Sequence, residues 1–145
     1  MASQKELDTC YMAVAEAHAT LSRGKRAKVG ACLVTKNGVV LGGCNGLAPG
    51  GDNELEQRDS HGALVTKEAV IHAELSCILK AAREGVSVVG STLYVTMSCC
   101  MRCSEMIAAA GVKRVVYKNA YRLTNGVENL KKLNLLIEKF NEEND

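Results

Sequence analysis

The stretch STLYVTMSCCMRCSEMIAAAGVKRVVY, residues 91–117, decides the fold of this chain. Two apolar runs rich in β-branched residues, 91–97 and 113–117, flank a run with helical spacing from Cys100 to Ala110. Gly111 follows that run, at the position where a glycine commonly ends a helix. Two strands joined by a helix of this length form a βαβ unit with a right-handed crossover, so the stretch predicts the centre of an α/β sheet.

The flanking sequence predicts the remaining elements. Asn37-Gly38 between two apolar runs is a strong hairpin signal, and residues 45–60, which hold the only proline, are typical of a surface loop. Apolar spacing predicts helices over 4–21, 73–83 and 127–132, a hairpin within 30–43 and a last strand over 133–137. We therefore predict a single domain over residues 1–145, with a polar tail at 141–145. Its fold is a three-layer α/β/α sandwich around a mixed five-stranded sheet.

Composition excludes several classes of function. The 145 residues carry a net charge of +2, with 47% hydrophobic and 23% charged residues, as in an ordinary soluble domain. One basic run, RGKRAK at 23–28, is present, and without tryptophan and with one phenylalanine the chain offers few surfaces for stacking bases. No run of 18 apolar residues occurs. We therefore expect neither a nucleic-acid partner nor a membrane partner.

The seven cysteines point to metal binding or core packing. The first residues, MASQKELDTC, lack the apolar core of a secretion signal, which favours a reduced cytoplasmic protein over a disulfide scaffold. Cys100 and Cys103 follow a strand and open a helix, so both sulfurs can reach one tetrahedral ion about 2.3 Å away. The helix N-terminus also favours two thiolates.

His72 and Glu74 stand at the opening of the preceding helix, so two helix starts can meet at one edge of the sheet. One histidine and two cysteines would leave a coordination position open, as in a catalytic zinc site. Each motif alone has a simpler interpretation: CxxC is also typical of redox sites or four-ligand structural zinc, and Glu74 alone suits a helix N-terminus. A structural site needs a fourth ligand, and the chain has neither a second CxxC nor an HxxxH.

The HAE of residues 72–74, followed after 25 residues by the CxxC of 100–103, resembles the zinc-dependent cytidine and deoxycytidylate deaminase superfamily. Within it, the blocks KVGACLVTKNGVVLGGCNGLAPGGDNELE (28–56) and HAELSC to RVVY (72–117) are most similar to the deoxycytidylate (dCMP) deaminases. The likeness runs from about Lys28 to Tyr121. It implies a homo-oligomeric hydrolase that holds Zn²⁺ on His72, Cys100 and Cys103 and converts dCMP to dUMP and ammonia for thymidylate synthesis. It also implies that Glu74 moves protons between water, the pyrimidine N3 and the leaving amine.

The resemblance further implies residues that contact the substrate. Asn45 is expected to bond the sugar or to hold the base-binding loop, and the Ala73 backbone to contact the polar edge of the base. Three basic residues are candidates for the phosphate, although each alone also fits a solvated surface charge: Arg26, Lys28 and Arg122. Arg83 falls where the family packs subunits and where regulated members bind effectors such as dCTP or dTTP.

Two features leave alternatives open. Cys99 stands where the family has proline, so the ion could instead take the register Cys99/Cys103, although the spacing of the family pair is intact. The substrate could also be free cytidine, guanine or a transfer-RNA adenosine. A non-catalytic module stabilised by zinc is a third alternative, and it would leave Glu74 without a role.

Overall fold

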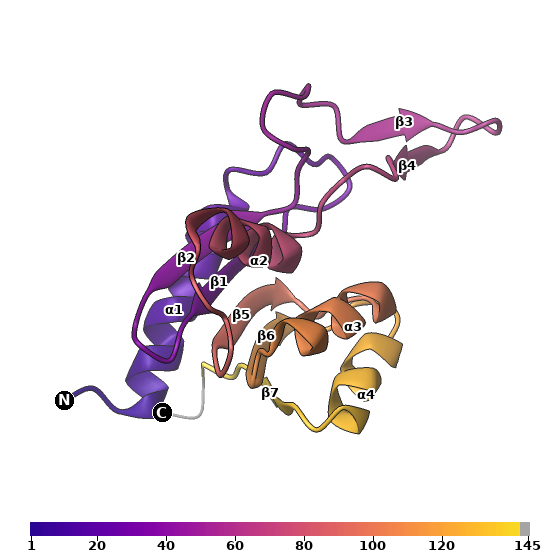
Figure 1. Ribbon diagram of the computed structural model, residues 1–145. Helices are drawn as coiled ribbons and strands as arrows, with labels where there is room; N and C mark the ends of the chain where they lie inside the picture. Colours follow the sequence, from indigo (N-terminus) through magenta and orange to yellow (C-terminus); the bar gives the residue numbers. More distant parts are fainter. Residues whose placement is uncertain (143–145) are drawn as a thin grey trace.

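The sheet has the predicted mixed topology. The structure, a computed structural model, describes residues 1–142, so most of the predicted polar tail lies outside the described residues (Figure 1). Five strands follow the order β2-β1-β5-β6-β7. Their bounds are Gly30–Val34 for β1, Val40–Cys44 for β2, Thr92–Met97 for β5, Arg114–Asn119 for β6 and Leu136–Lys139 for β7. β1 is antiparallel to β2 and β5, whereas β5, β6 and β7 are parallel.

Four helices cover the two faces of this sheet (Figure 1). They are α1 at Gln4–Ala19, α2 at Ala73–Glu84, α3 at Met101–Ala110 and α4 at Asn125–Lys132. Alternate residues of a strand point to opposite faces, and the core follows that rule. Tyr94 packs with α1, whereas its neighbours Leu93 and Val95 pack with the residues of α2, α3 and α4. The three-layer sandwich predicted from the sequence is confirmed.

Glycines end two of the helices, and Gly111 does so as predicted. Gly85 after α2 and Gly111 after α3 both have left-handed backbone angles, with φ of 70° and 95°. At the other end of the chain Ser3 and Glu6 form a capping box that starts α1. Within residues 1–142 no helix has both the length and the apolar character needed to cross a membrane.

The expected loop over 45–60 is wrong in part, because it contains a strand. β3 at Glu56–Arg58 pairs antiparallel with β4 at Leu64–Thr66, and this β3–β4 hairpin extends away from the main sheet (Figure 1). Asp59 stabilises its turn by accepting hydrogen bonds from the amides of His61 and Ala63. Strands of three residues are too short to show a period of two, and EQR contains no apolar residue, so the sequence pattern gave no strand signal.

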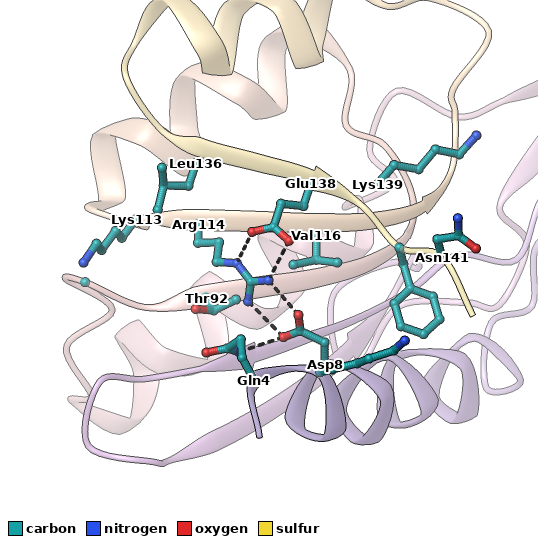
Figure 2. A pocket seen from close by; sticks show the side chains of 13 residues that line it. Gln4, Asp8, Thr92, Lys113, Arg114, Val116, Leu136, Glu138, Lys139 and Asn141 are labelled. Carbon is teal, nitrogen blue, oxygen red and sulfur yellow. Dashed lines mark hydrogen bonds and ion pairs between the residues drawn. The ribbon is translucent and has the colours of Figure 1, made fainter. Parts of the chain in front are cut away.

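A partly buried ion-pair network fastens α1 to the sheet. The Arg114 guanidinium of β6 donates to both oxygens of Asp8 (2.9 and 2.6 Å) and to both oxygens of Glu138 on β7 (3.0 Å each). The Tyr94 hydroxyl also donates to Asp8, at 2.6 Å. Figure 2 shows Arg114, Asp8 and Glu138 of this network in a cavity of about 670 Å³, with the amino groups of Lys113 and Lys139 directed away from it. We interpret this cavity as a structural junction, because its central cation already bonds two carboxylates.

Candidate active site

Two helix starts bring one histidine and two cysteines together. His72 is the N-cap of α2, Cys100 is the N-cap of α3, and Cys103 lies in the first turn of α3. The Nδ1 atom of His72 lies 3.2 Å from Sγ of Cys103 and 3.6 Å from Sγ of Cys100. Ligands of a tetrahedral zinc at ordinary bond lengths are separated by about 3.5 Å. The cluster therefore fits zinc, with Nδ1 as the nitrogen that faces the ion.

The cluster has three candidate ligands within the described residues. The three ligand atoms lie within 4.8 Å of one another, and no fourth His, Cys, Asp or Glu among residues 1–142 joins them. Cys99 is outside the cluster although it is buried, and burial raises the pKa of its thiol to about 12. The geometry thus favours the Cys100/Cys103 register over the Cys99/Cys103 register, and it leaves one position for a small ligand.

The pKa values of the two cysteine thiols in this cluster differ in a way that favours binding of a cation. Hydrogen bonds from Cys103 and His72 hold the pKa of the Cys100 thiol well below its ordinary value. The hydrogen bond to Cys100, with burial, raises the pKa of Cys103, which favours its protonated thiol. A divalent cation between them would displace that proton, because thiolate is the form that binds metal.

Glu74 lies beside the cluster and outside it. Its side chain is 3% exposed in the first turn of α2, and it lines the same pocket as His72 and Cys100. Burial raises the pKa of Glu74 to about 7. A carboxyl group with such a pKa gains and loses a proton readily at neutral pH, which suits general acid–base chemistry.

The pocket beside the cluster has a volume of about 420 Å³, enough for a small molecule. It lies at the end of the sheet where β5 and β6 finish, which is where ligands bind in open α/β sheets. Four of the residues expected at the substrate line it: Arg26, Asn45, Ala73 and Arg122. Lys28 is not among its lining residues, and Arg83 lies elsewhere on α2, paired with Glu84 at 3.4 Å.

Asn45 connects two segments of the pocket wall. Its side-chain oxygen accepts a hydrogen bond from the Val29 amide at 2.8 Å, and its side-chain nitrogen donates to the Ala27 carbonyl at 3.0 Å. Of the two roles expected for Asn45, this geometry favours holding the loop over bonding the sugar, because both ends of the amide group are engaged.

Several lining residues were not found by sequence reasoning. Thr66 lies on the unpredicted strand β4, and no local pattern marked it. Tyr121 also lines the pocket; its amide donates to Oγ of Ser98 at 2.7 Å, and Arg122 lies 5.8 Å from its ring centre. A usable signal existed for Tyr121 and Ser98, because both follow parallel strands at their carboxyl ends.

A three-ligand zinc centre beside a buried glutamate and a pocket defines the class of zinc hydrolases that activate water. A sequence model of the cytidine and deoxycytidylate deaminase zinc-binding region matches residues 5–119. The chain belongs to this family.

Relatives and a solved structure agree with that assignment. The chain is 35% identical over 125 residues to the deoxycytidylate deaminase of Mycobacterium phage D29, which is 79% of this chain and 96% of that protein. It is also 47% identical over 66 residues to the deoxycytidylate deaminase of Enterobacteria phage T2. That match covers 46% of this chain but only 35% of the relative. The crystal structure of the cyanophage S-TIM5 dCMP deaminase, in complex with dCMP and dUMP, superposes with a TM-score of 0.86. Identity there is 41%, covering 96% of this chain and 100% of that one.

Proposed function

We propose that this protein is a dCMP deaminase, which hydrolyses dCMP to dUMP and ammonia and so supplies dUMP for thymidylate synthesis. One observation carries the proposal: a single pocket is lined by His72 and Cys100 of the His-Cys-Cys cluster, by the buried Glu74 and by two arginines. The likeness to the S-TIM5 enzyme, whose crystals contained dCMP and dUMP, supports the nucleotide as substrate.

His72, Cys100 and Cys103 would hold the zinc. Zinc bound there would lower the pKa of a coordinated water from about 15.7 towards about 7. The Glu74 carboxylate takes a proton from the water and delivers it to N3 of the cytosine, while the water oxygen bonds to C4. Glu74 then takes a second proton from the hydroxyl now on C4 and passes it to the 4-amino group, the C4–N bond breaks, the C4 carbonyl forms, and ammonia leaves. One carboxyl group serves both steps because its pKa, about 7, suits either direction of transfer.

The remaining residues would bind and orient the substrate. The Ala73 backbone contacts the polar edge of the base, and Asn45 fixes the loop that carries Ala27 and Val29. Arg26 and Arg122 are the candidates for the 5′-phosphate because both line the pocket. Lys28 remains the third candidate from the sequence, and its place outside the lining makes it a useful comparison.

Further properties belong to this proposal. We propose one catalytic domain over residues 1–145, assembled into a homo-oligomer, with Arg83 at a subunit contact or at an effector site for dCTP or dTTP. An exposed Arg83 on α2 is compatible with either role. A cytoplasmic location and the absence of a nucleic-acid partner stay predictions from composition.

The decisive experiment measures ammonia release from dCMP, deoxycytidine, cytidine and guanine side by side. We expect kcat/KM for dCMP to exceed that for deoxycytidine by about a hundredfold or more. Two charge-assisted bonds to the phosphate contribute about 1.5–3 kcal/mol each, and each 1.4 kcal/mol corresponds to about tenfold. Equal values for the two substrates would contradict the nucleotide assignment and favour a nucleoside deaminase. No ammonia from any substrate, with zinc bound, would favour the non-catalytic module.

A further inference from the structure

The buried carboxylate of Glu56 is not used by the mechanism above, although it lies near the pocket. Glu56 is the first residue of β3 and is 9% exposed. Its Oε2 atom accepts hydrogen bonds from two consecutive backbone amides, those of Lys25 at 2.7 Å and Arg26 at 2.9 Å. The hydrogen bond from the backbone amide of Arg26 lowers the pKa of the Glu56 carboxyl group. The side chain is therefore an ionised acceptor that fixes the backbone at Arg26.

The opposite residue of the hairpin holds the other end of Arg26. Thr66 on β4 is the register partner of Glu56, and its Oγ1 lies 3.3 Å from Nη1 of Arg26, which donates to it. Thr66 and Arg26 both line the pocket, whereas Glu56 does not. The register pair Glu56 and Thr66 of the β3–β4 hairpin thus holds both the backbone and the guanidinium group of Arg26, a residue that lines the pocket.

The same segment is anchored on its far side by the sheet. Asn45 bonds the backbone of Ala27 and Val29, directly after Arg26. The turn before it is tight, because a Cβ atom on Gly24 would lie 2.2 Å from the Ala27 carbonyl oxygen. The segment 24–29 is therefore fixed between the main sheet and the hairpin, and only the Glu56 and Thr66 contacts depend on the hairpin.

We propose that Glu56 is a positioning residue for the 5′-phosphate of the substrate: the β3–β4 hairpin, through Glu56 and Thr66, aims Arg26 at that phosphate. This inference rests on the proposed dCMP deaminase activity. The hairpin then determines specificity for a nucleoside monophosphate and takes no part in the chemistry at C4. Loss of Glu56 leaves the zinc cluster and Glu74 in place, and it releases Arg26 from the position in which its guanidinium meets the phosphate.

The test compares dCMP with deoxycytidine in Glu56→Ala and Glu56→Gln. We expect Glu56→Ala to raise KM for dCMP about tenfold, since a misplaced binding group costs up to about a hundredfold. Its kcat for dCMP and its kcat/KM for deoxycytidine, which lacks the phosphate, should stay near the parent values. In Glu56→Gln the KM for dCMP should return most of the way to the parent value, because a glutamine oxygen can accept hydrogen bonds from the same two amides. Glu54→Gln is the matched control on the same segment, since Glu54 only pairs with the Lys25 side chain, at 3.9 Å.

A double variant separates positioning of Arg26 from a general role in folding. If Glu56 acts through Arg26, Arg26→Ala/Glu56→Ala should bind dCMP no worse than Arg26→Ala alone. Zinc content and melting temperature are measured for every variant, and Thr66→Val supplies the same comparison if Glu56→Ala does not fold. Additive losses, or equal losses on dCMP and deoxycytidine, would overturn the proposal. A parent enzyme without a preference for dCMP would refute the proposed function and this role together, whereas a preference that survives Glu56→Ala would refute this role alone.

Discussion

Replacement of Gly126 by alanine tests how α4 supports the zinc cluster. Gly126 is buried in the first turn of α4, and an added Cβ atom would lie 2.2 Å from the carbonyl oxygen of Cys99. It would also lie 2.8 Å from the carbonyl carbon of Cys100 and 2.9 Å from its oxygen. These neighbours are backbone atoms, so they cannot rotate away as a side-chain end would. Either α4 or the turn that carries Cys100 must move.

The size of the effect follows from two opposing contributions. Alanine is favoured over glycine inside a helix by about 1 kcal/mol, whereas overpacking a buried site costs about 1–3 kcal/mol. A contact of 2.2 Å requires roughly 1 Å of movement to become ordinary, so we expect the overpacking cost to exceed the gain in helix propensity. Metal–ligand distances tolerate only about 0.2 Å, so zinc affinity should fall roughly 10- to 100-fold, as when supporting residues of a site are lost.

Two measurements check this expectation: thermal unfolding, and zinc retention against a competing chelator. Asn125→Ala is the matched control, because Asn125 is the exposed neighbour in the same turn and alanine there raises helix propensity without crowding the cysteines. Gly126→Ala with unchanged or higher stability and the parent's zinc affinity would refute the reasoning. It would mean that α4 moves away freely and does not brace the turn at Cys100.

Three further outcomes are expected. Glu74→Gln should give a folded, zinc-loaded protein whose kcat falls by at least about 10²-fold; near-parental turnover would mean that another group moves the protons. Cys103→Ala should lose zinc and melt at a lower temperature, whereas Cys99→Ala should retain zinc; metal analysis with the opposite pattern would restore the Cys99/Cys103 register. Burial raises the pKa of Asp8, but hydrogen bonds led by Arg114 outweigh it and leave that pKa lowered. The bonds of Asp8 should therefore stabilise the fold by about 1–3 kcal/mol above about pH 5, and this contribution should fade as the pH drops below about 4. Asp8→Asn should unfold more easily than the parent at pH 7, by a margin that shrinks as the pH falls toward 3, and a constant difference across this range would argue against an ionised Asp8.

Much of the fold was predictable because the strands are long enough to show their periods. Residues 91–97 are rich in β-branched and aromatic residues, which are typical of strands, and β5 occupies Thr92–Met97. The helix ends at Gly85 and Gly111 were also predictable, since a left-handed backbone angle requires a residue such as glycine. The start of α4 was not predictable from the sequence, because Gly126 has low helix propensity. Glycine stands there because the close packing against Cys99 and Cys100 needs a residue without a side chain.

The candidate site also has one part that was predictable from the sequence and one part that was not. The approach of His72 to Cys100 and Cys103 was predictable from local rules, since each stands at a helix start and both helices share one core cluster with β5. The position of Arg26 was not, because its contacts, Glu56 and Thr66, come from a hairpin of three-residue strands some 30 to 40 residues further along the chain. Periodicity describes neighbours along the chain, and these contacts depend on tertiary structure.

The separation of His72 and Cys100 along the chain has a consequence for chain entropy. These two residues are 28 positions apart, and the segment between them contains all of α2 and β5. An ion that joins them closes a loop in the unfolded chain as a disulfide would, and a cross-link of this length restricts the unfolded ensemble by about 3–4 kcal/mol. Unfolding then either gives up the binding free energy of the ion or leaves the unfolded chain restricted by this loop. In both cases the zinc that serves the reaction opposes separation of the two helix starts, so depletion of zinc should lower the resistance of the whole domain to unfolding.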